Sequence, residues 1–301
     1  MIRTSTQLKA KVRNISGSDS FKAQTLIRNF LMERFLERIT LSSYRNNFIL
    51  KGGMLVSSMV GLETRATMDI DTTVKALPLS KENAEKMIQD IISIDVPDGV
   101  SFRITKVTDI MEEHDYPGIR FVLEAALDKL QQVIKVDIST GDVITPGAIQ
   151  YEYQLMFEER TISLWTYNLE TLLAEKLETI LARGTTNTRM RDFYDIYIIT
   201  SQKEYDSAVL KEAFIATSEK RNTTEQIPDF MIILNTLSSD ETMKNRWMNY
   251  CSESFYVGDL SWEEIITSIR TLVEKMSNDL HGQNYREDTI LKKMKQAGYI
   301  G

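Results

Sequence analysis

Four residues in one short stretch of this chain have types and spacing that could do chemistry together. Asp69 and Asp71 stand two positions apart in a strand-like segment, so their carboxylates point to the same side. Two such acids repel each other, and divalent cations placed between them and a phosphate relieve the repulsion; Mg²⁺ prefers these oxygen ligands. Upstream, Gly52 and Gly53 lie between a short strand and a helix, where they permit a tight turn and let a triphosphate approach backbone amides. The combination predicts nucleotidyl transfer from a nucleoside triphosphate (NTP).

A third carboxylate, Asp137, is expected to join this pair. Apolar residues at positions 134, 136 and 138 alternate with Lys135 and Asp137, which places Asp137 on the more polar face of a strand. Two metal ions about 4 Å apart must contact the attacking hydroxyl, the α-phosphate and the leaving pyrophosphate together. Three acids on neighbouring strands would suit that task.

Lys176 and two later acids form a second set of candidates, on predicted helices. Lys176 stands at the edge of an apolar stripe, so it is expected to point inward or along a cleft, and Asp192 and Asp195 share a helix face. Each has a simpler interpretation: Lys176 as a lysine whose stem covers apolar surface, and Asp192 as a helix cap or the ion-pair partner of Arg189 or Arg191. Acidic pairs on strand ends and Gly-Gly turns are also common when taken singly. The evidence for a nucleotidyl-transfer site is their order along the chain: strand, Gly-Gly, helix, Asp-x-Asp and then a third strand acid.

The elements that must position these residues follow from periodicity. Apolar residues recur every fourth position over 27–39, behind the N-cap candidates at 18–20, and predict a long packed helix. Another helix is expected over 80–92, and from Asn168 onward the pattern is helical, with 201–301 typical of a bundle. Strands are expected at Phe48–Lys51, Ile70–Val74, Phe102–Val107, Ile119–Ala125 and Gln132–Ile138.

Length and composition set outer limits. A chain of 301 residues with 42% hydrophobic content can bury a packed core. The single cysteine, Cys251, excludes an intrachain disulfide and argues against a cysteine-based zinc site, which fits a reducing cytoplasm. The first residues lack the apolar core of a signal peptide, and no apolar run is long enough to cross a bilayer. We therefore expect a cytoplasmic protein without membrane contact.

Charge is spread unevenly along the chain. The net charge is −7, yet residues 1–50 hold nine Lys or Arg against three Asp or Glu, or +6, and the remainder holds 27 basic and 40 acidic residues, or −13. The basic arm is either a solvated helix face or a nucleic-acid contact, and together with the arginines of 183–191 it is expected to flank the cleft. His114 and His281 lie in polar loops and are interpreted as exposed bystanders. No Ser-His-Asp order, Walker A loop or dinucleotide fingerprint is present.

With these motifs the chain resembles the AbiEii/AbiGii family of nucleotidyltransferase toxins of bacterial abortive-infection and toxin–antitoxin systems. The resemblance covers most of residues 1–200 and implies an α+β fold: a DNA polymerase β-like nucleotidyltransferase core with a mixed sheet and N-terminal helices (1–165), and a helical C-terminal bundle (166–301) that contributes to the cleft. It also implies action on the 3′ end of tRNA, which blocks translation, and a winged-helix antitoxin from the same operon. The segments that carry it are FLMERFLERITLSSYRNNFILKGGMLVSSMVGLETRATMDIDTTV, IKVDIS, LLAEKLETILARG and RMRDFYDIYIIT.

The resemblance also implies roles for single residues. One position departs from the wider fold class: Met54 follows Gly53 where nucleotidyltransferases of this fold have Gly-Ser, which leaves backbone amides, Ser57 or Ser58 to meet a triphosphate. The family motifs match the metal-binding Asp69 and Asp71, the hydroxyl residue Thr67, the third strand acid Asp137, the phosphate-associated Lys176, and the acids Asp192 and Asp195.

We therefore expect a phage-defence toxin that uses Mg²⁺ or Mn²⁺ to move a nucleoside monophosphate from an NTP to an acceptor hydroxyl, foremost the 3′ end of tRNA. Asp69, Asp71 and Asp137 would hold the metals, and Asp137 would help to deprotonate the hydroxyl. Lys176 would neutralise charge on the phosphates, and Asp192 would orient Lys176 or bind the base or ribose. Asp195 would contact the nucleotide, as would Gly52, Gly53 and Thr67. Two alternatives stay open: NTP-dependent phosphate transfer to RNA or protein, and a regulator that binds nucleotide without turnover.

Overall fold

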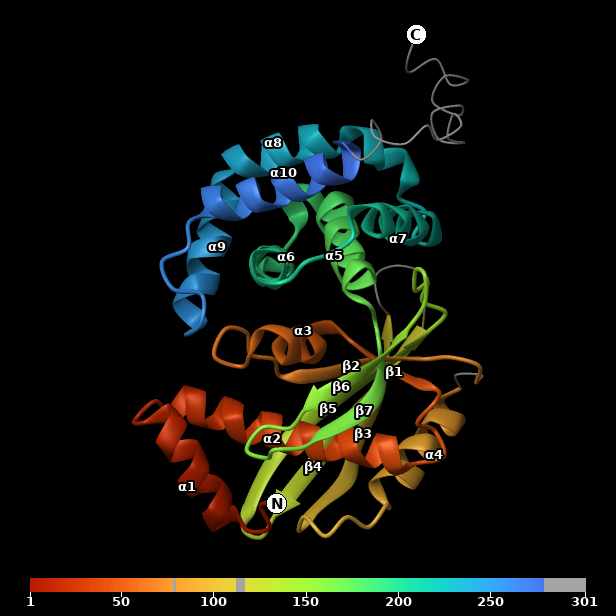
Figure 1. Cartoon of the computed structure of the whole chain (residues 1–301), viewed down its shortest axis with the longest axis vertical. Helices are drawn as coiled ribbons and strands as arrows, with labels where there is room; N and C mark the ends of the chain where they lie inside the picture. The colour runs from red at the N-terminus through yellow and green to blue at the C-terminus, as the bar shows by residue number, and fades with distance from the viewer. Residues whose placement is uncertain (78–79, 112–116, 279–301) are drawn as a thin grey trace.

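The computed structural model describes residues 1–77, 80–111 and 117–278, which form a mixed α+β fold around a seven-stranded sheet (Figure 1). The strand order is β3-β4-β5-β2-β1-β7-β6, with parallel pairing of β1 with β7 and of β2 with β5 and antiparallel pairing elsewhere. The strands are β1 (Phe48–Lys51), β2 (Asp69–Val74), β3 (Val100–Met111), β4 (Pro117–Leu127), β5 (Leu130–Thr140), β6 (Ile149–Gln154) and β7 (Thr161–Thr166). The helices are α1 (Ser5–Ser16), α2 (Ser20–Leu41), α3 (Gly52–Val60), α4 (Lys81–Ile92), α5 (Leu169–Arg183), η1 (Gly184–Thr186), α6 (Met190–Gln202), α7 (Ser207–Lys220), η2 (Thr224–Asp229), α8 (Phe230–Ser239), α9 (Glu241–Glu253) and α10 (Trp262–Asn278).

All five predicted strands are confirmed, and the last four extend beyond their predicted bounds, the first of these by Asp69 alone. Two strands, β6 and β7, were missed. In β6 only Tyr153 is buried, so the strand shows little alternation, whereas β7 carries a usable signal in the alternating buried Ile162 and Leu164.

The predicted helices are also confirmed. Asp19 caps α2 by accepting a hydrogen bond from the Lys22 amide, and Ser80 caps α4 in the same way. The additional helix α1 buries Leu8 and Val12 and packs against α2. α2 and α4 cover one face of the sheet, where β3, β4 and β5 turn their apolar residues inward (Figure 1).

The elements after β7 are helical throughout the part of the chain that the structure describes, and α5 to α10 pack together above the sheet in Figure 1. The change from strand to helix falls at Thr166, next to the predicted boundary of 165/166; the division into two domains stays a prediction. Among the helices of the described residues, none combines the length and apolarity that a membrane span requires. Residues 279–301 of the predicted bundle lie outside the described residues, as do His114 and His281.

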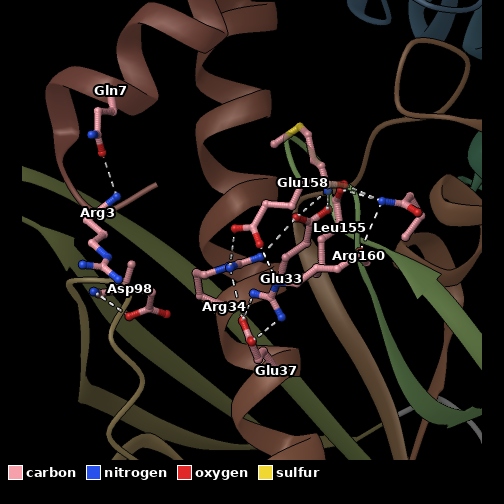
Figure 2. Close-up of polar contacts among 12 residues, drawn as sticks. Arg3, Gln7, Glu33, Arg34, Glu37, Asp98, Leu155, Glu158 and Arg160 are labelled. Carbon is pink, nitrogen blue, oxygen red and sulfur yellow. Dashed lines mark hydrogen bonds and ion pairs between the residues drawn. The ribbon is translucent and has the colours of Figure 1, made fainter. Parts of the chain in front are cut away.

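A cluster of buried charges ties α2 to the β6–β7 hairpin (Figure 2). Arg34 contacts Glu37 and Glu158, each at 3.1 Å, and Arg160 binds Glu37 at 2.6 Å. Glu33 accepts hydrogen bonds from a backbone amide of the hairpin turn at 3.0 and 3.2 Å. Burial raises the pKa of Glu33 to about 8, which the neighbouring Arg34 only partly opposes. Glu33 is therefore the member of this cluster that holds a proton near neutral pH.

Candidate active site

The three predicted acids, Asp69, Asp71 and Asp137, lie on one face of the sheet, and we call them the carboxylate edge. Parallel pairing sets Asp71 of β2 opposite Asp137 of β5, as the alternation in the sequence predicted. Antiparallel pairing sets Lys51 of β1 opposite Asp71 and Arg120 of β4 opposite Asp137. Paired residues of neighbouring strands point to the same face, and Asp69, two residues before Asp71, shares that face. The sheet register therefore brings all three acids together.

Both glycines are required by close packing around Asp71. Gly52 has φ +64°, and a Cβ there would lie 2.1 Å from the Asp71 carboxylate oxygen, so no other residue fits without movement. The Gly53 amide, at the start of α3, donates a hydrogen bond of 3.4 Å to the same oxygen. A Cβ on Gly53 would lie 2.6 Å from the Thr67 hydroxyl. The turn therefore holds Asp71 and Thr67 against the N-terminus of α3, where the sequence predicted a triphosphate.

The carboxylate edge carries uncompensated negative charge. Burial, followed by the neighbouring Asp137 and Asp69, raises the pKa of Asp71 above its ordinary value, although Lys51 opposes the shift. One oxygen of Asp69, Oδ1, is buried and finds no hydrogen-bond donor within the described part of the chain; Lys135 Nζ lies 4.0 Å away. A buried carboxylate oxygen without a donor is costly unless a ligand satisfies it. Asp69 and Asp71 therefore fit a divalent cation.

Asp137 is held differently from the other two acids. The Arg120 guanidinium donates hydrogen bonds to both carboxylate oxygens of Asp137, at 2.7 and 2.6 Å. These hydrogen bonds raise the pKa of Arg120. Over the described ranges, no three Asp, Glu, His or Cys side chains converge closely enough to hold a metal. The third acid, Asp137, is instead bound to a protein cation.

An ion pair behind the edge was not foreseen from the sequence. Lys51 contacts Asp142 at 2.6 Å, and Tyr167 and Ser139 donate hydrogen bonds to the same carboxylate at 2.7 and 3.1 Å. Although burial alone would raise it, Lys51 and these donors hold the pKa of Asp142 at about 2. Lys51 is thereby fixed beside Asp71, where its charge favours the ionised acid.

The helical candidates form a compact network between α5 and α6. Lys176 Nζ lies 3.0 Å from Asp192 and 2.6 Å from Asp195, and Arg189 contacts the other oxygen of Asp192 at 2.6 Å. Arg65, from the loop before β2, binds both oxygens of Asp195. The structure thus confirms that Asp192 and Asp195 share a face and that Lys176 points inward, with a side chain only 7% exposed.

The charges of this network are paired with one another, although Asp192 Oδ2 accepts no hydrogen bond within the described residues and has only its ion pair with Arg189. Although burial alone would lower it, Asp195 and Asp192 raise the pKa of Lys176. Burial alone would raise the pKa values of the two acids, but Arg65 and Lys176 lower that of Asp195 to about 2, and Lys176 and Arg189 lower that of Asp192. Asp195 is fully buried, so its predicted contact with the nucleotide stays a prediction, and the structure gives it a positioning contact instead.

A cavity of about 810 Å³ separates the carboxylate edge from the helical half. Asp69, Asp71 and Asp137 line one side with Gly52 and Thr67, and Lys176 and Asp192 line the other. The helical side also carries a group of cations that we call the cationic wall: Arg183, Arg189, Arg191, Lys220, Arg221 and Arg246. An acidic edge that faces a cationic wall can hold a metal-bound polyphosphate between them.

The prediction that both basic segments flank the cleft is met only in part. Arg183, Arg189 and Arg191 line the cavity, and Arg28 of the arm contacts Met68 next to Asp69. The other arm cations on α1, Lys9, Lys11 and Arg13, lie elsewhere. The first residue of α1 binds the turn before β5 through the contact of the Ser5 amide with Asp128, at 2.8 Å. The seven residue steps along β5 from Leu130 to Asp137 separate that turn from the site by about 23 Å. Packing of Leu8 and Val12 on α2 holds the arm there.

Comparisons with solved structures show a likeness of fold. The crystal structure of JHP933 from Helicobacter pylori matches with a TM-score of 0.52 and 14% identity, over 92% of this chain and 97% of that chain, which is a likeness of fold. A structure from H. pylori described as a putative nucleotidyltransferase gives a TM-score of 0.49 and 14% identity, over 87% and 99% of the two chains. Comparison with curated protein sequences gives no significant match.

A family model, with which the mixed sheet and its acidic edge are consistent, gives the class of protein as a nucleotidyltransferase. The family model described as nucleotidyl transferase AbiEii toxin, type IV toxin–antitoxin system, matches residues 34–268. The chain belongs to this family. The match begins within α2 and continues into α10, so it reaches further into the helical half than the sequence segments alone indicated. A toxin of such a system implies an antitoxin partner and an NTP substrate.

Proposed function

We propose that the protein transfers a nucleoside monophosphate from an NTP to the 3′ hydroxyl of tRNA, with the help of Mg²⁺ or Mn²⁺. The observation that carries the proposal is the unsatisfied Asp69 Oδ1 at an acidic edge that faces the cationic wall across a cavity of about 810 Å³. Bound ions would supply Lewis-acid activation of the α-phosphate and stabilise the leaving pyrophosphate.

The carboxylate edge would do the chemistry. Asp69 and Asp71 would hold the ions, and the Gly53 amide keeps Asp71 in place. Once its oxygens leave Arg120, Asp137 would complete the metal site and accept the proton of the attacking hydroxyl. Lys51, held by Asp142, would keep Asp71 ionised.

The helical side would bind the nucleotide. The cationic wall supports contact with the triphosphate, because its guanidinium groups suit phosphate oxygens in geometry and charge. Lys176 lines the cavity, so its neutralisation of phosphate charge stays part of the proposal, and Asp192 would orient it from 3.0 Å. Thr67, Gly52 and the backbone amides of the turn would meet the nucleotide from the other side.

In the cell, the proposed role is that of a phage-defence toxin. Modification of the tRNA 3′ end would stop aminoacylation and translation in the cytoplasm, and a winged-helix antitoxin from the same operon would counteract it. Membership of the AbiEii toxin family supports this role.

Incubation of the purified protein with total tRNA and each NTP labelled at the α-phosphate tests the proposal. We expect a labelled tRNA band and released pyrophosphate with the wild type, and neither with Asp71→Asn, whose shape is preserved. Label that reaches RNA or protein only from the γ-phosphate would instead indicate phosphotransfer. NTP binding without pyrophosphate release would indicate a non-catalytic regulator.

A further inference from the structure

A strip of cations crosses the open face of the β3–β4–β5 half of the sheet and ends at the carboxylate edge. In the row that contains Asp137, its β4 neighbour is Arg120. The next row holds Lys135 of β5, Val122 of β4 and Lys106 of β3. The third row adds Arg103 of β3. We call Arg103, Lys106, Arg120 and Lys135 the basic strip.

The two faces of this half-sheet differ sharply. On the covered face, residues such as Phe121, Leu123 and Val136 are fully buried under helices. On the open face, Arg103 is 67% exposed, Lys135 is 45% exposed and Lys106 is also exposed. Neighbouring strands lie about 4.8 Å apart, so the strip is about 10 Å wide from β3 to β5. It is therefore an accessible surface that leads directly to the site.

Charge identifies the ligand that suits this surface. Four cations gather there on a chain of net charge −7. Arg103 is paired with Glu124 at 3.0 Å, and the two cations next to the site meet its acids, Arg120 at Asp137 and Lys135 at 4.0 Å from Asp69. A row of exposed cations that reaches the edge of a phosphate-transfer site can attract a polyanion. The strip approaches the acids from the sheet side, whereas the cationic wall lies on the helical side of the cavity. The two cationic surfaces can therefore serve two different anions.

We propose that the basic strip binds the sugar–phosphate backbone of the acceptor RNA and directs its 3′ hydroxyl to Asp137. The inference rests on the proposed function, and it assigns the acceptor path to the sheet face and not to α1. α1 lies at the far end of β5, about 23 Å from Asp137 by strand length.

Arg120 links acceptor binding to the site. Its guanidinium holds both oxygens of Asp137, and a backbone phosphate is the other partner that a guanidinium binds through two parallel hydrogen bonds. Its side chain is 35% exposed, so a phosphate can reach it. An RNA phosphate on Arg120 would release Asp137 for the hydroxyl that follows it. Acceptor binding would thereby complete the catalytic edge.

The test compares two matched double variants of the full-length protein. Arg103→Ala/Lys106→Ala removes two exposed cations of the strip, and Lys9→Ala/Lys11→Ala removes two exposed cations of α1. Transfer of α-labelled nucleotide to total tRNA is measured from 50 to 300 mM salt, and NTP binding is measured separately by calorimetry. We expect the strip variant to have a several-fold higher KM for tRNA and a salt slope lower by about 1.4, or about 0.7 for each lost phosphate contact. Its NTP affinity and unfolding temperature should match those of the wild type.

The outcomes separate this inference from the proposed function. A strip variant that modifies tRNA with the wild-type KM and salt slope overturns the inference while wild-type labelling still supports nucleotidyl transfer. A loss that appears in the α1 variant instead assigns the RNA path to the arm and also overturns it. Absence of wild-type labelling with every NTP contradicts the proposed function itself.

Discussion

The two sides of the cavity bury charged groups in opposite ways. On the helical side, Lys176, Asp192 and Asp195 pair with one another and with Arg65 and Arg189, so each charge has a partner. On the sheet side, three acids share one face, and burial together with mutual repulsion raises the pKa of Asp71. One oxygen of Asp69 has no donor within the described residues.

The paired charges on the helical side therefore stabilise the structure of the site, whereas the acids on the sheet side are suited to bind a ligand. A buried network of paired charges stabilises one geometry, and removal of one member lowers the stability of the folded protein considerably. An edge of repelling acids gains most when a cation arrives, and removing one acid relieves repulsion. We therefore expect substitutions on the two sides to separate activity from stability.

The largest effect should come from Asp71→Asn. The amide preserves the shape of the side chain but removes a charged ligand from the edge, so kcat for tRNA labelling should fall by at least about 10²–10³-fold. The unfolding temperature should stay equal or rise, because a repulsive buried charge is gone. Activity within a few-fold of the wild type would contradict the assignment of the edge.

The second largest effect should be a loss of folding stability in the Lys176→Met variant. This change leaves Asp192 and Asp195 buried with one cation fewer, and breaking a buried pair in this way costs about 3–5 kcal/mol. Urea unfolding should show the loss, and Lys9→Met, at an exposed position of α1, serves as the control. A fully stable Lys176→Met protein without activity would show that the lysine acts on substrate alone and does not hold the network.

Arg120→Gln sharpens the comparison, because it removes the cation that binds Asp137 at 2.6 Å. Release of Asp137 should raise Mn²⁺ affinity by at least about fivefold, which corresponds to the ~1 kcal/mol that a unit charge exerts at 4 Å in water. The same variant should have a higher KM for tRNA. Unchanged metal affinity would mean that Asp137 takes no part in the metal site.

The smallest effect on activity is expected at the buried cluster of Figure 2, whose residues do not line the cavity. The pKa of Glu33 is about 8 in the folded protein and about 4.5 when unfolded, so between these values the folded state binds the extra proton. Its contribution to stability is complete below about pH 4.5 and declines by about 1.4 kcal/mol per pH unit until about pH 8. Glu33→Gln should remove this dependence in urea unfolding series. An identical pH profile in the variant would show that Glu33 is ionised in the folded state.

Local patterns predicted the part of the site that lies close together in sequence. The order of elements from β1 through Gly52 to Asp71 can be predicted from the sequence, because strand alternation and turn formation depend on residues only a few positions apart. Alternation also placed Asp137 on the correct face of β5. The role of Arg120 was not predicted, because its pairing with Asp137 depends on the register between β4 and β5. The role of Lys51 was not predicted either, because its ion-pair partner Asp142 lies 91 positions away in the sequence.

The misplacement of the N-terminal arm has a physical cause as well. Charge shows that Lys9 and Lys11 are accessible, but the buried Leu8 and Val12 decide where the helix docks. Likewise β6 was missed because a strand at the edge of the sheet, with one buried residue, shows no clear period.

Binding of Mn²⁺, followed by electron paramagnetic resonance at neutral pH, tests the central claim most directly. The wild type should bind the ion, Asp71→Asn should lose at least about tenfold in affinity, and Asp195→Asn, if folded by circular dichroism, should bind nearly as the wild type does. Equal binding by Asp71→Asn and the wild type, or loss of binding only in Asp195→Asn, would contradict the account.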